Sequence, residues 1–313
     1  MSARSPKGAP ASSQHRIWFP DDSPYHPRRV SRLKHSFSEH PLMQLAALKA
    51  LALKFEAQGN GLVKFQRTGA RSADALEVLS QSDRGMSIEE IFDRIEEPRS
   101  WISLYNVGTD PEYREMIDQI MESVAHLTDA FDPGAFETDG FVFVSAPPSA
   151  TPFHIDRENN FFLQLHGRKR MSVWHPDDRT VVPEAEIESK IGRGAKSTVP
   201  FRDEYFKRAA FDAELRAGEG VYMPSTAGHT TNTEALPEGR DDTYSVSIGI
   251  VFYTRATRRA AYVYAVNDQL RRLGLNPRAP FDSPVRDAVK YPLGRSMIFA
   301  KKVLRGFEVP PGM

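Results

Sequence analysis

The sequence predicts a mainly β protein, a barrel or sandwich of short strands with helical segments on both sides. Three observations support this prediction. Short apolar runs separated by turn residues occupy about residues 141–253, which is typical of antiparallel strands. Helical periodicity precedes and follows this region. A chain of 313 residues with 40% hydrophobic and 26% charged residues is also large enough to bury a core.

The composition excludes several classes of protein. The chain has no cysteine, so disulfides, thiolate metal sites, iron–sulfur clusters and cysteine nucleophiles are excluded, and any metal must use nitrogen and oxygen ligands. The 41 basic and 41 acidic residues balance, so no nucleic-acid partner is expected. No apolar run approaches the about 18 residues of a membrane span, and the first residues lack the apolar core of a secretory signal. We therefore expect no membrane partner and a cytoplasmic location.

Changes in composition divide the chain into four regions. Residues 1–35 contain seven Lys or Arg against two Asp and are predicted to form a mobile basic arm. Residues 36–130 are predicted to be a helical N-terminal region that leads into the barrel. The barrel is expected over residues 131–256, followed by a C-terminal helical region over 257–313.

Start signals identify the helices before the barrel. Apolar residues among good helix formers predict a helix over 41–58. Ser87 with Glu90 three residues later forms a capping-box pattern that opens a helix over 86–95. A strand is expected over 101–107. Asp110 before Pro111 then starts a helix whose buried stripe runs from Tyr113 to Val124.

The predicted strands are short. They cover 141–145, 160–165, 169–174, 220–223 and 244–253, and the second and third are predicted to form a hairpin turned at Gly167.

Helical periodicity resumes at Arg258, and prolines separate this helix from a last amphipathic stretch that ends near Leu304. One stripe of the first helix is apolar and has two interpretations, a homodimer face or a cap on the barrel of the same chain. The stripe consists of Tyr262, Val266, Leu270 and Leu273.

A candidate metal site begins with His154 and Asp156. Residues two apart on a strand project to one face, so both side chains can bind one ion. His229, which follows the strand and turn around 218–224, can supply a third ligand. Two histidines and one carboxylate form the facial triad of non-haem iron(II) oxygenases. The alternative is that these histidines are ordinary strand-end and loop residues.

His175 and Asp177 have the same spacing as His154 and Asp156. Pro176 lies between them and Asp178 follows, a combination that ends a strand and starts a turn. We therefore assign this second pair to a surface turn.

The residues around the first pair resemble a known family. Their order and spacing are similar to those of JmjC-type cupin oxygenases, which use iron(II) and 2-oxoglutarate. The residues that carry this resemblance are Thr151, Pro152, His154, Asp156, Asn160, Phe161, Phe162, Gln164, Gly167, Lys169 and Arg170. Within this group the sequence is most similar to the asparaginyl hydroxylase that inhibits hypoxia-inducible factor and to bacterial cupin-like proteins. The resemblance implies a double-stranded β-helix, the cupin or jelly-roll core, with helical N- and C-terminal flanks.

The resemblance also implies a set of site residues. Iron(II) would be held by His154, Asp156 and His229. Lys169 would pair with the distal carboxylate of 2-oxoglutarate, helped by the Thr151 hydroxyl, and Asn160 would lie near the other end of the co-substrate. A second interpretation makes Lys169 a surface residue, although strand alternation points it away from its basic neighbours. Tyr105 either adds a hydroxyl to the same carboxylate or is a packed strand tyrosine.

One part of the sequence departs from the pattern of that hydroxylase. That hydroxylase carries an asparagine on one of the last strands of its barrel. At the corresponding place this sequence has Ser247, Gly249 and Ile250.

The function implied by the resemblance is hydroxylation of a protein or peptide side chain, with a small-molecule substrate also open. Oxygen and 2-oxoglutarate would give succinate and a ferryl species that abstracts hydrogen from the substrate. Two alternatives remain. The first is a catalytically inactive cupin that serves as a binding or regulatory module, and the second is a cupin metalloenzyme that does not use 2-oxoglutarate.

Overall fold

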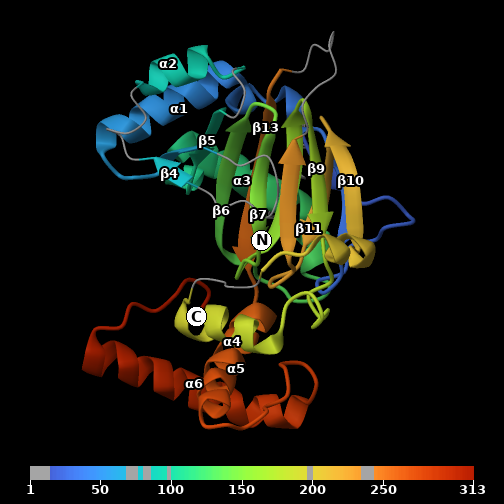
Figure 1. Ribbon diagram of the computed structural model, residues 1–313, viewed down its shortest axis with the longest axis vertical. Coiled ribbons are helices and arrows are strands. Elements are labelled where there is room, and N and C mark those ends of the chain that lie inside the picture. Colours follow the sequence, from blue (N-terminus) through green and yellow to red (C-terminus); the bar gives the residue numbers. More distant parts are fainter. Residues whose placement is uncertain (1–14, 68–76, 80–85, 97–99, 196–199, 234–242) are drawn as a thin grey trace, which may run out of the picture.

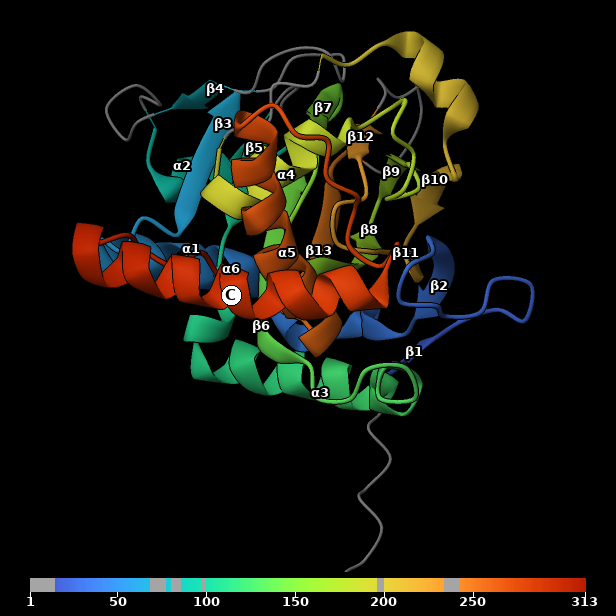
Figure 2. The same ribbon diagram turned by 90° about the horizontal axis from the view of Figure 1, so that it is seen from below.

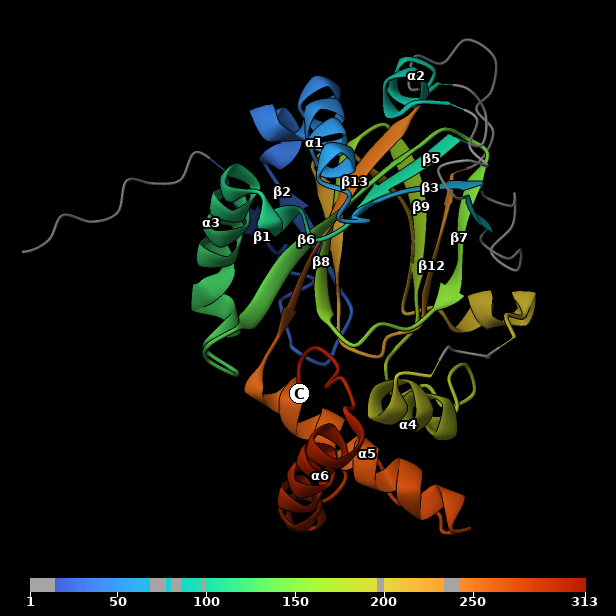
Figure 3. The same cartoon turned by 90° about the vertical axis from the view of Figure 1, so that its left-hand side faces the viewer.

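Two antiparallel sheets face each other in the computed structural model of the chain, which describes residues 15–67, 77–79, 86–96, 100–195, 200–233 and 243–313. Figure 3 shows the larger sheet with α1 and α3 on its outer side, the smaller sheet opposite, and α4, α5 and α6 at one end. The mainly β prediction is confirmed, with a double-stranded β-helix core and helical flanks.

Within the described part of the chain, the larger sheet has nine strands in the spatial order β1-β2-β11-β8-β13-β6-β5-β3-β4. In that order they span Ile17–Trp18, Ser31–His35, Glu219–Met223, Asn159–His166, Ser245–Tyr253, Phe136–Ser145, Ser100–Leu104, Val63–Arg67 and Glu77–Leu79. The smaller sheet has the order β10-β9-β12-β7, with strands Phe211–Arg216, Arg168–Val173, His229–Thr233 and Ser149–His154.

In the described residues, six α-helices lie around the sheets. They are α1 (Leu45–Gln58), α2 (Ile88–Asp93), α3 (Pro111–Thr128), α4 (Glu184–Arg193), α5 (Arg255–Arg272) and α6 (Pro284–Arg305), and short 3₁₀ turns span Phe37–Glu39, Pro41–Met43, Val107–Thr109 and Asp203–Arg208. The predicted start signals are confirmed, because the Ser87 hydroxyl accepts from the amide of Glu90 and the Asp110 carboxylate accepts from the amides of Glu112 and Tyr113. Helix α4, which lies between β9 and β10, was missed by the sequence analysis.

The main core lies outside the barrel, between the larger sheet and helices α1 and α3. Leu48 and Phe55 of α1 and Ile117 of α3 pack there against Val142 of β6 and Ile248 of β13. These two strands alternate, so the next residues along each face the barrel interior. The interior can therefore carry polar side chains while the outer layer supplies the apolar burial.

Residues 15–35 are not a mobile arm as predicted. They form β1 and β2 at the edge of the larger sheet, where Gly220 of β11 pairs with Leu33. His35 is buried, and its Nε2 donates to the backbone oxygen of Gln164 on β8. The sequence of β2 alternates, since Arg32 and Lys34 face outward while Ser31, Leu33 and His35 face inward. Residues 1–14 lie outside the described part.

The hairpin predicted at Gly167 is also wrong. β8 belongs to the larger sheet and β9 to the smaller one, so the chain crosses between sheets at this glycine. Gly167 has a φ of 64°, and a Cβ there would lie 2.2 Å from the backbone oxygen of Tyr244. A sequence signal for a turn does not show whether the two strands pair, because the backbone partner is set by the rest of the fold.

The region predicted to be helical also contains strands. Residues 36–130 contribute β3, β4 and β5 to the larger sheet in addition to three helices, so this region is part of the sheet rather than only a lead into it. Within the described residues, no helix is both long enough and apolar enough to cross a bilayer.

We predict that Gly167→Ala destabilises the fold far more than Gly194→Ala. Both glycines have positive φ, but a Cβ at Gly194 meets nothing within 4 Å. Urea unfolding should show a loss of about 1 kcal/mol for Gly194→Ala and at least about 3 kcal/mol for Gly167→Ala, or failure to fold. Equal losses would show that the crossing at Gly167 is not tightly packed.

Candidate metal centre

His154 and His229 lie side by side on paired strands of the smaller sheet. His154 ends β7, His229 begins β12, and the two residues are direct partners in the antiparallel ladder. Their ring centroids are 4.1 Å apart. The pairing of two short strands therefore brings together side chains that are 75 positions apart in the sequence.

Both imidazoles are held in the tautomer that suits metal binding. Nδ1 of His154 contacts the backbone oxygen of Pro152 at 2.8 Å, and Nδ1 of His229 contacts that of Ala227 at 3.0 Å. Because a carbonyl oxygen only accepts, each Nδ1 carries the proton and donates it. In each neutral ring the lone pair is then on Nε2, which points toward the other candidate ligands.

Asp156 completes the group just beyond the end of β7. Its Oδ2 lies 3.4 Å from Nε2 of His229 and 3.8 Å from Nε2 of His154, and one ligand atom from each residue lies within 4.8 Å of the others. Ligands about 2.1 Å from one ion sit about 3 Å apart at neighbouring octahedral positions, so small movements would bring all three onto a metal.

Two backbone contacts hold the Asp156 segment in place. The amide of Thr226, in the loop before β12, donates to the backbone oxygen of Asp156 at 2.9 Å. The guanidinium of Arg157 donates to the backbone oxygens of Lys190 and Ile191 near the carboxyl end of α4, where a positive charge is favourable. Helix α4 thus supports the residue that follows the candidate ligand.

The electrostatics of the three groups favour the metal-binding charge state. Burial, with a contribution from His229, lowers the pKa of His154 to about 4, so its ring is neutral at pH 7. Burial tends to raise the pKa of Asp156, but the two histidines outweigh it and keep the carboxylate ionised. Burial tends to lower the pKa of His229, but its contact with Asp156 raises it, so a metal must compete with a proton there.

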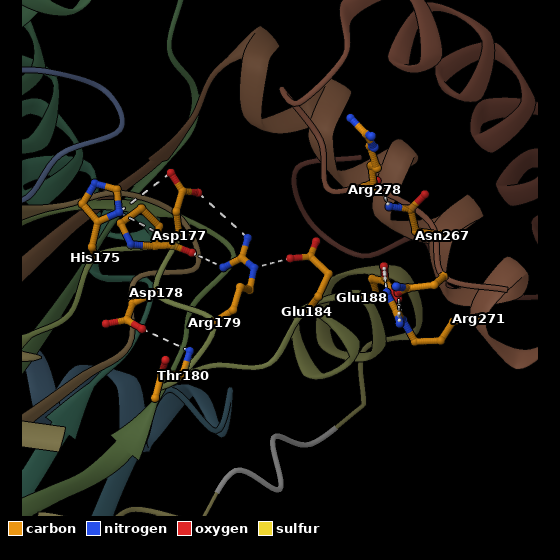
Figure 4. Close-up of polar contacts among 12 residues, drawn as sticks. His175, Asp177, Asp178, Arg179, Thr180, Glu184, Glu188, Asn267, Arg271 and Arg278 are labelled. Carbon is orange, nitrogen blue, oxygen red and sulfur yellow. Dashed lines mark hydrogen bonds and ion pairs between the residues drawn. The ribbon is translucent and has the colours of Figure 1, made fainter. Parts of the chain in front are cut away.

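The second His–Asp pair lies in a turn after β9, as expected. The Asp177 carboxylate accepts from the guanidinium of Arg28 at 2.9 Å through both oxygens. The guanidinium of Arg179 lies 3.9 Å from Oδ1 of the same carboxylate (Figure 4). His175 Nδ1 is 3.8 Å from this carboxylate. The arginines occupy the positions that a cation would need, and the described residues offer no third ligand here.

A cavity of about 390 Å³ extends from the candidate metal centre into the barrel. All seven residues singled out in the sequence line it, namely Tyr105, Thr151, His154, Asp156, Asn160, Lys169 and His229. Most of its remaining wall is apolar and was not anticipated, and consists of Trp101, Phe141, Phe143, Phe162, Met171 and Met223. A few polar groups within apolar walls are typical of a small-molecule site.

Lys169 lies inside this cavity, and its neighbours point outward. Arg168 and Arg170 pair with Glu214 and Asp212 on the outer side of the smaller sheet, as alternation requires. The Lys169 ammonium is buried and donates to the hydroxyl of Ser247 at 3.0 Å. No carboxylate of the described residues forms an ion pair with it, and burial lowers its pKa from 10.5 to about 7.

The remaining polar residues occupy defined positions in the same cavity. The hydroxyls of Thr151 and Thr231 are 2.7 Å apart across the β7–β12 ladder. Asn160 is buried, and its Oδ1 has no hydrogen-bond partner among the described residues. The ring of Tyr105 is tilted against that of Phe141, with ring centroids 5.3 Å apart, and the ammonium of Lys64 lies over the Tyr105 ring at 4.7 Å.

Ser247 and Thr231 are the polar site residues that sequence reasoning missed. Ser247 was noted only as a departure from the family pattern, whereas the structure makes it the hydrogen-bond partner of Lys169. Its signal was present, because a serine within the apolar strand β13 is a buried polar group that needs a partner. Thr231 gave no comparable signal, since β12 was not predicted.

Comparisons with known proteins give one family match. A family model described as a cupin-like domain matches residues 30–257. No curated protein matches the sequence significantly.

Solved structures with similarity to the chain include YcfD from Escherichia coli. An X-ray structure of that protein shares 17% identity over 87% of this chain and 65% of its own, with a TM-score of 0.45. A second, titled as a ribosomal oxygenase in complex with cobalt and 2-oxoglutarate, shares 17% identity over 87% of this chain and 63% of its own, with a TM-score of 0.43. The chain therefore spans less than two thirds of the length of these proteins.

We predict that cobalt(II) binds at His154, Asp156 and His229. His154→Ala or Asp156→Ala should weaken the affinity by about a hundredfold or more, measured by titration calorimetry or by the visible absorption of cobalt. His175→Ala is the matched control, because it removes the histidine of the second pair, and it should leave the affinity unchanged. Equal losses in all variants would contradict the assignment.

We also predict that Lys169 destabilises the unliganded fold. Because its pKa falls from 10.5 to about 7 on folding, the unfolded chain binds more protons between these values and the unfolding free energy rises with pH there. In metal-free urea unfolding, Lys169→Met should be more stable than the wild type at pH 7 by about 1–3 kcal/mol, and the difference should shrink toward pH 10.

The control for this measurement is Lys34→Met, on the exposed face of β2, which should show no such difference. A Lys169→Met protein less stable than the wild type at pH 7 would mean that the ammonium supports the fold.

Proposed function

The chain belongs to the cupin-like domain family, and from that premise we propose that it is an iron(II)- and 2-oxoglutarate-dependent oxygenase that hydroxylates a protein or peptide side chain. The observation that carries the proposal is the buried Lys169 ammonium in the same cavity as a His–Asp–His group. A buried ammonium without a carboxylate partner is costly, and an anionic ligand would remove that cost.

The three candidate ligands fit ferrous iron. Two neutral imidazoles and one carboxylate leave an iron(II) ion with residual positive charge and about three open positions, which suit a chelating keto acid and oxygen. When bound, iron(II) would activate oxygen so that the keto acid is converted to succinate and carbon dioxide, with one oxygen atom passing to succinate and the other to the substrate.

The chain's own residues would orient the keto acid. Lys169 would donate to the distal carboxylate, and the Thr151 and Thr231 hydroxyls lie on the same wall and can add hydrogen bonds. Asn160, whose Oδ1 has no partner among the described residues, would lie toward the end that chelates the metal. Fixing both ends of the co-substrate restricts its orientation before oxygen arrives.

The apolar wall would exclude water from the reacting groups. Trp101, Phe143 and Met171 belong to three different strands and all face the cavity. A dry wall strengthens the charge interactions of Lys169 and Asp156 and leaves few competing proton donors near the metal. We propose that the substrate side chain enters this cavity beside the co-substrate.

The two alternatives predict different experimental results from those of the proposed enzyme. An inactive binding module would need no metal, so failure to bind iron or cobalt would favour it. A cupin enzyme that does not use 2-oxoglutarate would keep its activity in Lys169→Ala, whereas the proposed enzyme would lose it.

We predict that the purified chain binds 2-oxoglutarate in the presence of iron(II) without oxygen, seen as a weak visible absorption band. Admission of oxygen should then yield succinate. Lys169→Ala should reduce 2-oxoglutarate affinity by at least about thirtyfold, because the charge-assisted contact is lost, while cobalt affinity is unchanged. Absence of both the band and succinate from the wild type would overturn the proposal.

Substrates should appear as peptides heavier by one oxygen atom in proteome-wide mass spectrometry. These peptides should be absent when His154→Ala replaces the wild type, with His175→Ala as the control that retains them.

A further inference from the structure

Residues 306–313, which we call the tail, follow α6 and dock on the rest of the chain. Figure 2 shows α6 ending at the left edge of the molecule and the C-terminus lying near the middle, so the tail turns back along the helix. No helix or strand includes these residues, yet Gly312 is buried. The tail is therefore held by a few side-chain and backbone contacts rather than by a sheet or a helix.

Gly312 fits against the ring of Tyr253 in a way that excludes any side chain. Its φ is 80°, in the left-handed region, and a Cβ there would lie 2.2 Å from Cε1 of Tyr253, the last residue of β13. Its amide donates to the carboxylate of Glu137 on β6 at 2.7 Å. The Tyr253 ring is also stacked on Phe136, with centroids 5.9 Å apart, so it has little room to move away.

Tyr253 links the tail to the segment that carries Asp156. Its hydroxyl donates to Oε1 of Glu158 at 2.6 Å, and Glu158 lies two residues after Asp156. Both acidic residues belong to the loop between β7 and β8, residues 155–158, which lies outside both strands. Such a loop depends on side-chain contacts for a fixed position.

Two further contacts of the tail reach the same loop. Pro311 lines a cavity of about 20 Å³ together with Arg157, which follows Asp156. A cavity of this size holds about one water molecule, so the tail closes this side of the loop. Met313 packs against the apolar cluster that contains Ile155, the residue before Asp156.

We propose that the tail positions Asp156 for metal binding through Tyr253 and Glu158, so that tail docking and metal binding are coupled. A ligand that is already held in place loses less conformational freedom when the ion binds. Contacts outside the ligand shell change metal affinity by about 10–100-fold. The coupling is reciprocal, so a bound ion also favours the docked tail.

The proposal rests on the candidate metal centre and not on the reaction that the metal serves. Because the tail belongs to neither sheet, it can leave without disturbing the β7–β12 ladder that places the two histidines. Its release would therefore act on Asp156 rather than on His154 and His229.

Titration of the full chain with cobalt(II) tests the proposal. Gly312→Ala should weaken cobalt affinity by at least about tenfold, because the added Cβ cannot fit against Tyr253. Gly306→Ala is the matched control, since Gly306 also lies in the tail with a positive φ, 59°, but a Cβ there would meet nothing within 4 Å. This control should leave the affinity unchanged.

A double-mutant cycle tests the link through Tyr253. Tyr253→Phe keeps the ring against Gly312 but removes the hydrogen bond to Glu158, so it should also weaken cobalt binding. If the tail acts through this hydrogen bond, adding Gly312→Ala to Tyr253→Phe should weaken binding little further. Losses that add in full would overturn the link.

Amide hydrogen exchange of the metal-free chain gives a readout that needs no metal. Gly312→Ala should speed exchange over residues 155–158 and leave that of β8 unchanged. Cobalt should in turn slow exchange of the Gly312 amide in the wild type.

Two results would contradict the coupling. Lower stability of Gly312→Ala in urea, with unchanged cobalt affinity and unchanged exchange over 155–158, would mean that the tail only supports the fold. A wild type that binds no cobalt would overturn the metal centre together with this proposal, whereas a wild type and Gly312→Ala that bind cobalt equally would overturn this proposal alone.

Discussion

The antiparallel pairing of β7 with β12 is the constraint on which the candidate site depends. It sets His154 opposite His229 at one end of the ladder and Thr151 opposite Thr231 further along it. A shift of one residue in this register would turn one imidazole to the other face of the sheet and separate the two rings. The Pro152 and Ala227 carbonyls, each two residues before a histidine, then fix both rings in the same tautomer. The candidate metal ligands and the two threonine hydroxyls of the cavity thus depend on the same pair of strands.

The barrel interior is where folding and function make opposite demands. Strands β8 and β13 are buried on both faces, yet they place Asn160, Gln164 and Ser247 inside, and β9 adds the Lys169 ammonium. Buried polar groups of this kind add little to the free energy of unfolding. A buried ammonium without a carboxylate partner lowers that free energy. The fold tolerates them because the larger sheet has a second, largely apolar face against α1 and α3. Stability comes mainly from the outside of the barrel, which leaves the inside available for chemistry.

Helices α4, α5 and α6 connect the candidate metal centre to the outer surface. Arg157 binds the carboxyl end of α4, beside Asp156. The fully buried Glu188 of α4 accepts two hydrogen bonds from Arg271 of α5, shown in Figure 4. Loss of the Arg271 guanidinium would leave the buried charge of Glu188 without compensation, so this ion pair ties α4 to α5. Helix α6 packs on α5 in turn, where the ammonium of Lys290 donates to Asn267 at 2.6 Å.

Local chemistry in the sequence determined much of this protein. Capping residues located α2 and α3, and alternation oriented Lys169. Pro176, which ends the strand between His175 and Asp177, set that pair apart from the equally spaced His154 and Asp156. The tertiary structure alone decided which strands pair: it placed β8 and β9 in different sheets, drew residues 15–35 into the larger sheet, and gave Lys169 its partner Ser247. The reason is physical. Capping and alternation act over a few residues of one segment, whereas strand pairing joins backbone groups that are distant in the sequence and leave no local trace in it.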